Sequence, residues 1–301
     1  MNTCGAACKG ERRTDMTMIR GTTELIAHIG FPTHAFKSPL IYNPYFEEAG
    51  IDAVVVPMGC RAEHFASVLR AVFALTNTRG ALITMPHKVA AAAVVDEASS
   101  AVRMAGSCNA VRRLKDGRLH GDLFDGEGFV KALSRKGCEI AGARAFVVGA
   151  GGVGAAIAAS LAAAGVRAIA LWDIESDRSR ALVNRLGSLY PNLELTADVD
   201  HPAADRDIVV NATPMGMNEN DPLPVDIECV PPAAWVGDVV MTPEITPLLN
   251  AARARGCRIQ VGTDMLFEQI PAYLEYFGFP TATPERLRQI ADAADDERSK
   301  Y

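Results

Sequence analysis

The feature that most constrains the fold is a glycine-rich run between an apolar segment and a long stretch of small residues. Residues 146–148 are Phe-Val-Val, and residues 149–154 are Gly-Ala-Gly-Gly-Val-Gly. This spacing matches the G-x-G-x-x-G turn that joins a strand to a helix and binds a dinucleotide pyrophosphate. Gly149 permits the tight turn, Gly151 permits close approach to the phosphates, and Gly154 lets the helix pack near the strand. A structural turn without a ligand is the weaker alternative in this strand-turn-helix context.

The end of the next apolar run bears on which dinucleotide is bound. Asp173 follows Leu171 and Trp172, about 20 residues beyond the glycines, where a carboxylate can accept hydrogen bonds from the adenosine ribose. A helix N-cap is the alternative role for Asp173. A carboxylate there repels a 2′-phosphate, so the sequence favours NAD over NADP. Arg178 and Arg180 follow closely and keep NADP as the second option.

Short apolar runs alternate with helical patterns from Leu25 onward, which indicates an α/β chain with a mostly parallel sheet. In the first half we expect helices near 40–49 and 62–76 and a long alanine-rich helix after Lys88. An Asp-Gly turn at 115–117 predicts a hairpin between 109–114 and 118–123. The expected strands before that hairpin are 25–29, 53–57 and 81–85.

The second half repeats the alternation after a boundary near 141–143, where an Ala-Gly-Ala follows a helix that ends at Gly137. We expect helices between its strands and a helical C-terminus over 264–277 and 284–295. The strands predicted there are 145–148, 168–172, 207–211, 235–240 and 258–261.

Composition and charge exclude several classes of protein. The chain has 30 basic and 36 acidic residues, a net charge of −6 that argues against a nucleic-acid binder. No apolar run reaches the roughly 18 residues of a membrane span, and the N-terminus lacks a signal-peptide core. Seven scattered cysteines fit a reducing compartment, so we expect a cytoplasmic protein. Cys4 and Cys8 lack a second pair at zinc-finger spacing, so we expect no metal site and a flexible tail over 1–18.

Two polar clusters in the first half are candidates for chemistry. One spans residues 84–88, at the end of a predicted strand, and the other spans 121–126, after the hairpin. Lys88 and Asp125 brought together at a cleft could share a proton transfer, with the lysine exchanging the proton and the carboxylate fixing its position. Each alone could equally be a solvated helix start or an N-cap. His87 is a candidate helper, and a solvent-facing position in the first helical turn is the favoured alternative.

Several further motifs run along almost the whole chain. In their order they resemble the shikimate dehydrogenase family, including its quinate/shikimate branch, from Gly30 to Gly278. Besides the glycine turn, the matching stretches are Lys37–Pro39, Ile83–Lys88, Gly106–Val111, Phe124–Gly126, Asn211–Met217, Asp238–Pro243 and Gly262–Gln269.

The resemblance implies a two-domain α/β architecture with a cleft between the domains. It places a substrate domain at 19–127, completed by C-terminal helices over 265–301, and a Rossmann-like nucleotide domain at 128–264. The implied activity is reversible hydride transfer between nicotinamide and a hydroxyl-bearing ring carbon of a small molecule. A monomer or a homodimer is expected.

The resemblance also implies roles for individual residues. Lys88 and Asp125 fall on the catalytic pair. The implied substrate ligands are Thr84, Asn109 and Gln269 for ring hydroxyls and Ser38 for the carboxylate. The implied cofactor ligands are Gly149, Gly151, Gly152, Gly154, Asp173, Thr213 and Gly262.

The departures from the family pattern concern the substrate. Phe36 stands in the place of a carboxylate-binding serine, and Met241 in the place of a tyrosine near the same group. Each lost hydrogen bond to a carboxylate is worth about 1.5 to 3 kcal/mol, so losing two weakens shikimate binding by roughly two orders of magnitude. We therefore expect a less acidic, more apolar or bulkier substrate. Apolar residues also replace polar pocket residues at Leu82, Leu123 and Phe124.

Two alternatives remain. One is a true quinate/shikimate dehydrogenase that holds the carboxylate through Ser38 and another group. The other is a nucleotide-sensing regulator that keeps the fold without turnover, and the presence of both Lys88 and Asp125 speaks against it.

Overall fold

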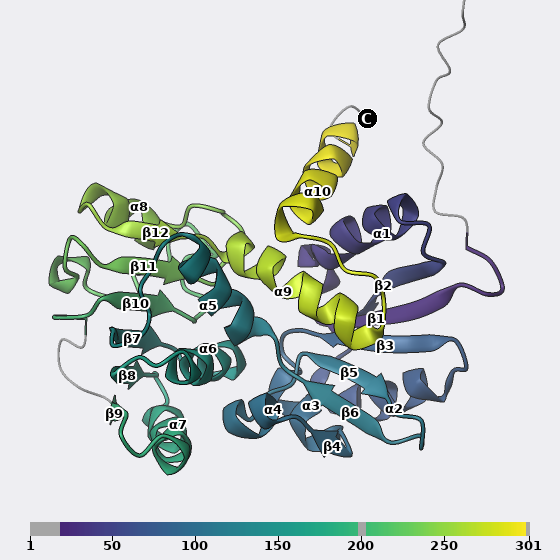
Figure 1. Cartoon of the computed structure of the whole chain (residues 1–301), viewed down its shortest axis with the longest axis horizontal. Coiled ribbons are helices and arrows are strands. Elements are labelled where there is room, and N and C mark those ends of the chain that lie inside the picture. Colours follow the sequence, from purple (N-terminus) through teal and green to yellow (C-terminus); the bar gives the residue numbers. More distant parts are fainter. Residues whose placement is uncertain (1–18, 198–202, 299–301) are drawn as a thin grey trace, which may run out of the picture.

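The computed structural model describes residues 19–197 and 203–298, which form two six-stranded sheets side by side (Figure 1). The strand order is β2-β1-β3-β5-β6-β4 in the first sheet and β12-β11-β10-β7-β8-β9 in the second. Helices cover both sheets. The predicted two-domain α/β class is therefore confirmed.

The first sheet is mostly parallel. β1 lies between β2 and β3 and is parallel to both, whereas β5 and β6 form the predicted antiparallel hairpin. Its strands are β1 (Glu24–Gly30), β2 (Ala53–Gly59), β3 (Thr78–Ile83), β4 (Glu97–Ala98), β5 (Ala110–Arg113) and β6 (Leu119–Asp122). The helices of this half are α1 (Ser38–Glu48), α2 (Phe65–Ala74), α3 (Lys88–Val94) and α4 (Ser100–Ala105), with 3-10 helices η1 (Thr33–Ala35) and η2 (Ala62–His64).

The predicted long helix after Lys88 is wrong, because α3 ends at Val94. Val95 is already extended, with φ −68° and ψ 145°. The chain then lies beside β6, where the Asp96 carboxylate accepts a 2.8 Å hydrogen bond from the backbone N–H of Leu119. Ser99 caps the next helix. Pairing with β6 and two β-branched residues outweigh the helix propensity of the alanines.

The second sheet is parallel throughout, and the order in which its strands are added reverses at β7. β8 and β9 lie on one side of β7, and β10, β11 and β12 on the other. In such sheets ligands bind beyond the carboxyl ends of the strands, where the order reverses. The strands are β7 (Arg144–Val148), β8 (Ala168–Trp172), β9 (Glu194–Ala197), β10 (Ile208–Asn211), β11 (Trp235–Asp238) and β12 (Arg258–Gln260). The helices are α6 (Gly152–Ala163), α7 (Ser176–Leu189), α8 (Pro247–Ala254) and the 3-10 helix η3 (Ile227–Cys229).

Three further helices connect the halves. α5 (Asp125–Arg135) packs against both α6 and α9 (Gly262–Phe277). Figure 1 shows α9 running from the second sheet across to the first, where its aromatic residues join the core on one face of β1. α10 (Pro284–Arg298) packs on α1. Because α5 contacts elements of both halves, the predicted boundary at residue 128 stays a prediction.

Candidate active site

Lys88 and Asp125 meet, as the sequence predicts. Lys88 is the first residue of α3, after β3, and Asp125 is the first residue of α5, after β6. The Lys88 Nζ donates a 2.5 Å hydrogen bond to Asp125 Oδ2, and the two side chains are 13% and 4% exposed. A lysine–carboxylate pair this well shielded from solvent can hold a proton-exchanging amine in one place.

The segment before β5 fixes both members of this pair. The Lys88 carbonyl accepts a 2.8 Å hydrogen bond from the backbone N–H of Cys108. The neighbouring Asn109 accepts a 3.1 Å hydrogen bond at Oδ1 from the backbone N–H of Phe124, which precedes Asp125. One short stretch of backbone therefore positions the lysine and the carboxylate together.

Asn109 and Gln269 offer unused polar atoms. Asn109 Nδ2 and Gln269 Oε1 are buried and have no hydrogen-bond partner among the described residues. An unpaired buried polar group costs about 1 to 3 kcal/mol. A hydroxyl group can pair with either kind of atom, and the substrate-binding role that the resemblance implies for these two residues stays a prediction.

Thr84 and Phe36 lie together against Gly30, at the end of β1. A Cβ atom on Gly30 would lie 2.4 Å from Thr84 Cγ2 and 2.8 Å from Phe36 Cζ, so a side chain at position 30 would displace both. Ser38 starts α1 next to Phe36 and is half-buried. Ser38 and Thr84 thus both lie near the aromatic ring of Phe36.

His28 is a site residue that the sequence reasoning missed. The residue is 6% exposed, and its ring stacks on Phe36, with the ring centroids 4.1 Å apart and the planes at 28°. Burial, and then the charge of Lys88, lower its pKa to about 3. A histidine within the apolar strand pattern of 25–29 was the available signal.

The other wall of this region is aromatic. Phe124 contacts Tyr273 edge-on, with the ring centroids 4.9 Å apart. Burial, and then the charge of Asp125, raise the pKa of Tyr273 well above its usual value. The buried hydroxyl of Tyr42, one helical turn from Ser38, has no partner in the part of the chain that the structure describes.

The apolar pocket replacements separate into two groups. Leu82 and Phe124 belong to the core cluster that contains Tyr42 and Tyr273. Leu123 is instead in the cluster that contains Ile29, from the opposite face of β1. Leu123 lies just after the end of β6, and the prediction that it lines the pocket stays a prediction.

His87 is not solvent-facing, and that alternative is wrong. The residue is 1% exposed, and its ring stacks on Phe65, with the centroids 4.4 Å apart. Its Nε2 lies 2.8 Å from the carbonyl oxygen of Cys60. These contacts hold the loop before Lys88 against the core.

The glycine turn has the geometry of a dinucleotide site. Gly149 has φ +96°, and a Cβ atom on Gly154 would lie 1.8 Å from the Gly149 carbonyl oxygen. A Cβ atom on Gly151 would meet nothing within 4 Å. The turn is therefore tight within and open on the side where a pyrophosphate approaches, so the residues present fit the cofactor.

Asp173 braces this turn. Its Oδ2 accepts a 2.6 Å hydrogen bond from the backbone N–H of Ala150, and its Oδ1 accepts one of 2.9 Å from that of Glu175. The N-cap alternative is wrong, because α7 begins at Ser176 with Glu175 as its N-cap. The nearby cations face acidic side chains: Arg178 lies 2.9 Å from Glu175, and Arg180 lies 4.0 Å from Asp177.

A polar network closes the ends of β10 and β11. The Thr213 hydroxyl donates a 2.6 Å hydrogen bond to Asn211 Oδ1, and Asn211 Nδ2 donates one of 3.0 Å to Asp238 Oδ1. Burial raises the pKa of Asp238. Gly262 starts α9, and a Cβ there would lie 2.4 Å from the Val240 carbonyl oxygen. The predicted Thr213 and Gly262 thus lie at the carboxyl edge of the sheet.

Two contacts join the halves across the site. The Ser107 hydroxyl donates a 2.9 Å hydrogen bond to the carbonyl oxygen of Gly152, at the start of α6. The Lys37 Nζ donates one of 3.2 Å to the carbonyl oxygen of Met241. The glycine turn and the residues around Lys88 and Phe36 are therefore neighbours in space.

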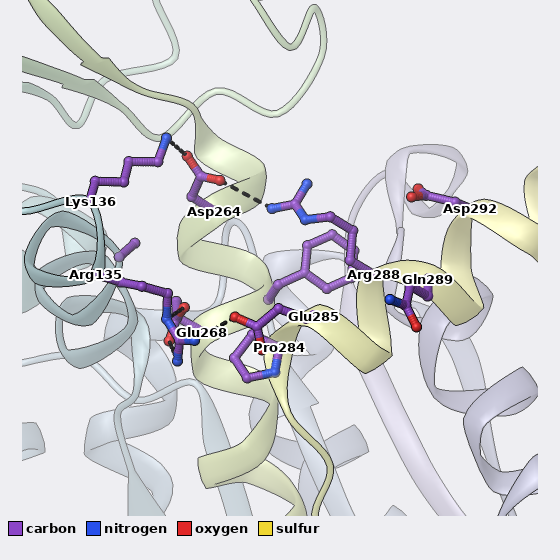
Figure 2. A pocket seen from close by; sticks show the side chains of 11 residues that line it. Arg135, Lys136, Asp264, Glu268, Pro284, Glu285, Arg288, Gln289 and Asp292 are labelled. Atoms are coloured by element: carbon purple, nitrogen blue, oxygen red, sulfur yellow. Dashed lines mark hydrogen bonds and ion pairs between the residues drawn. The ribbon is translucent and has the colours of Figure 1, made fainter.

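A separate cavity of about 320 Å³ lies where α5, α9 and α10 meet (Figure 2). Its charged lining residues form ion pairs with one another. Asp264 binds Lys136 and Arg288, and Arg135 binds Glu268 and Glu285. Its lining does not include Lys88 or Asp125, and its cations already have partners. We therefore infer that these ion pairs stabilise the packing of α5, α9 and α10 and that the cavity is not the active site.

The structure also bears on metal binding and on membrane insertion. Across 19–197 and 203–298, no three His, Cys, Asp or Glu side chains are grouped so as to hold a metal ion. None of the helices described is both long and apolar enough to cross a bilayer. Cys4 and Cys8 lie outside the described residues.

Comparison with known proteins identifies the family. Residues 29–111 match a family model described as the shikimate dehydrogenase substrate binding domain, and residues 131–217 match one described as shikimate / quinate 5-dehydrogenase. A shikimate dehydrogenase (NADP(+)) from Rubrobacter xylanophilus is 37% identical over 254 residues, 83% of this chain and 89% of that protein. The chain belongs to the shikimate dehydrogenase family. Like other members of the shikimate dehydrogenase family, it is an NAD(P)-dependent oxidoreductase that acts on CH–OH groups.

Solved structures of the shikimate dehydrogenase family show the same fold. The shikimate 5-dehydrogenase from Listeria monocytogenes, in complex with shikimate and NAD, is 29% identical with a TM-score of 0.82, covering 90% of this chain and 97% of that one. The 5-ketofructose reductase of Gluconobacter sp. strain CHM43 is 25% identical with a TM-score of 0.78, covering 90% and 98%. Both similarities extend over both domains.

Proposed function

We propose that the protein is an NAD-dependent dehydrogenase that reversibly oxidises a ring or chain hydroxyl of an uncharged polyhydroxylated substrate. The observation that carries this proposal is the stacked pair of Phe36 and His28. It occupies the region where the family resemblance implies a carboxylate-binding serine. The phenyl ring of Phe36 offers no hydrogen bond to a carboxylate.

The rest of the site supports this substrate class. Thr84, Asn109 and Gln269 remain, and two of them keep unpaired buried atoms suited to hydroxyl groups. The 5-ketofructose reductase, whose solved structure is similar to this chain, is named after a substrate that has no carboxylate group. A family fold with polar contacts for hydroxyls and an aromatic surface in place of a carboxylate site fits a polyol or a ketose.

Lys88 and Asp125 account for the proton in the reaction. The bound nicotinamide supplies the hydride acceptor in one direction and the donor in the other. As the C–H hydride leaves the substrate, Lys88 takes the hydroxyl proton and the C–O bond becomes a carbonyl. Asp125 holds the lysine Nζ at 2.5 Å, so the amine keeps one position during the transfer. The intact pair also speaks against a regulator without turnover.

The residues around Asp173 support NAD as the preferred dinucleotide. Three carboxylates, Asp173, Glu175 and Asp177, lie within five residues, and the two arginines that follow face two of them. A 2′-phosphate would meet this negative group. The relative from Rubrobacter is named as an NADP(+) enzyme and the structure from Listeria contains NAD, so the chain's own residues carry this part of the proposal.

A true quinate/shikimate dehydrogenase is the second candidate. Lys37 and Ser38 favour it, because an ammonium group and a hydroxyl beside Phe36 could together hold a carboxylate. Binding would then require the Lys37 Nζ to exchange the Met241 carbonyl for the substrate.

Initial rates on a substrate panel test the proposal. The panel contains shikimate, quinate, methyl shikimate, cyclic polyols and ketoses, each with NAD and with NADP at limiting concentration. We expect kcat/KM for shikimate with NAD to stay below about 10⁵ M⁻¹s⁻¹, within the lower part of the usual enzyme range, and uncharged compounds to exceed it. A higher value for shikimate, with methyl shikimate much poorer, would support the second candidate instead.

A further inference from the structure

His28 points from β1 toward the substrate region. Residues of a strand alternate between its two faces, and Ala27 and Ile29 pack in the cluster on one face. Ile26 is in the cluster on the other face, and Gly30 faces Thr84 and Phe36. His28 shares that second face with Ile26 and Gly30. Its ring is therefore directed to the side where Phe36 and Thr84 lie.

The ring has no polar partner. Nδ1 is fully buried, and no hydrogen bond to either ring nitrogen joins His28 to another described residue. Its neighbour across the β1–β3 ladder is Leu82, and its stacking partner is Phe36. Neither side chain can form a hydrogen bond, so the fold leaves the ring nitrogens unpaired among the described residues. A buried histidine without a partner points to a ligand that completes it.

The electrostatic surroundings keep the ring neutral. The charged group that acts on His28 is Lys88, which with burial lowers the pKa of the histidine to about 3. A neutral imidazole has one N–H donor and one nitrogen acceptor. A hydroxyl can donate or accept and therefore pairs with either nitrogen, whereas a carboxylate only accepts and would bring a charge into an apolar wall.

We propose that His28 is a specificity-determining residue that hydrogen-bonds a hydroxyl group of the substrate, in the place where Phe36 removes the carboxylate site. The proposal rests on the proposed function and names the group that replaces the carboxylate contact. Phe36 fixes the plane of the imidazole by stacking, and His28 supplies the polar atom. Together they select a hydroxymethyl or a ring hydroxyl over a carboxylate.

Three probes with one ring test the proposal. They are 3,4,5-trihydroxycyclohexenes that carry a carboxylate (shikimate), a hydroxymethyl group or a methyl group on the same ring carbon. We expect wild type to prefer the hydroxymethyl over the methyl compound by about tenfold in kcat/KM, roughly the value of one hydrogen bond. In His28→Leu this ratio should fall to about one, and the loss should appear mainly in KM.

Two variants serve as controls. His28→Gln keeps a donor and an acceptor and should retain part of the preference, and it also covers the outcome that the leucine variant fails to fold. His64→Gln, at an exposed histidine on η2, should behave as wild type.

The outcomes separate the two proposals. A hydroxymethyl-to-methyl ratio that stays at its wild-type value in both His28 variants would overturn the role of His28 and leave the proposed function standing. A wild type that prefers the carboxylate probe over both others would contradict the proposed function. A ratio that still collapses in His28→Leu would support the contact with His28 in either case.

Discussion

A Cβ atom on Gly152 would lie 3.3 Å from the Cβ of Lys88 and 3.3 Å from the Cβ of Ser107. The start of α6 and the start of α3 are therefore in contact across the two domains. The hydrogen bond from Ser107 to the Gly152 carbonyl fixes the same junction. The distance between the dinucleotide turn and Lys88 is thus set by direct packing.

Gly152→Ala should lower turnover more than stability. The added methyl group must push the two domains apart by a few tenths of an ångström, which moves Lys88 away from the cofactor turn. Misplacement by about 1 Å can cost about a hundredfold in rate, so we expect roughly a tenfold loss of kcat. Steady-state kinetics and thermal melting check this. An unchanged kcat would mean that the junction does not set the geometry of the reaction.

Two alanine substitutions in the same turn should affect different properties, one the stability of the protein and the other its affinity for NAD. Gly154→Ala places a Cβ 1.8 Å from the Gly149 carbonyl oxygen, so we expect a loss of stability of several kcal/mol or failure to fold. Gly151→Ala places a Cβ in open space, with a backbone that alanine can adopt, so stability should change by less than about 1 kcal/mol. Its methyl group blocks the approach of the pyrophosphate, so NAD binding by titration calorimetry should weaken at least tenfold. Tight NAD binding by Gly151→Ala would refute the assignment of the turn.

Lys88 and Asp125 should behave as one unit. Lys88→Ala should reduce kcat by about 10² to 10⁴, the usual contribution of general acid–base catalysis, while NAD binding is retained. Asp125→Asn should also reduce kcat, because Lys88 loses its charged partner at 2.5 Å. The double variant should be no slower than the slower single variant. Multiplying losses would show that the two residues act independently.

Asp173→Asn should shift the cofactor preference. The asparagine Oδ1 can still accept the hydrogen bond from the Ala150 backbone, whereas its Nδ2 cannot accept the one from Glu175, so the turn keeps one of its two hydrogen bonds to residue 173. The lost charge no longer repels a 2′-phosphate, and we expect the NADP-to-NAD ratio of kcat/KM to rise about tenfold. If the NADP-to-NAD ratio of kcat/KM is the same in wild type and in Asp173→Asn, Asp173 does not determine the cofactor preference.

Acid should destabilise the protein partly through His28. Its pKa is about 3 in the folded protein, against 6.5 for an unperturbed histidine. Below pH 6.5 the unfolded chain therefore binds a proton that the folded protein does not, and the free energy of unfolding falls as the pH falls. Between pH 7 and pH 5 the loss from this group is about 2 kcal/mol.

Urea unfolding of wild type and His28→Asn at both pH values measures this contribution. The variant lacks the imidazole, so its loss between pH 7 and pH 5 should be smaller by about that amount. Asp238, whose pKa is raised by burial, changes stability in the opposite direction and is the same in both proteins. Equal losses in the two proteins would show that His28 is not a buried neutral histidine.

Local sequence signals predicted the parts of the fold that depend on local chemistry. The glycine turn after residues 146–148, the hairpin around 115–117 and the parallel strands all occur as expected. The meeting of Lys88 and Asp125 also followed, because each starts the helix after a strand of the first sheet, at the edge where polar residues gather. The family motifs added the expectation that Lys88 and Asp125 form a catalytic pair.

The misses depend on contacts that no local pattern contains. α3 ends early because Asp96 binds the backbone of Leu119, a partner 23 residues away. β9 was not predicted because its four residues alternate weakly and gain their structure by pairing with β8. His87 and His28 are buried by packing against Phe65 and Phe36, which the residue types alone do not reveal.

α9 begins on the nucleotide side and ends in the aromatic core of the substrate side. Asp264, in its first turn, forms ion pairs with Lys136, just after α5, and with Arg288 of α10 (Figure 2). The two halves thus share α9. Ion pairs hold the N-terminal end of this helix, and apolar packing holds the rest of it. We expect the two halves to keep their packing on α9 when they move relative to each other, so that they rotate about this helix and stay joined while reactants exchange.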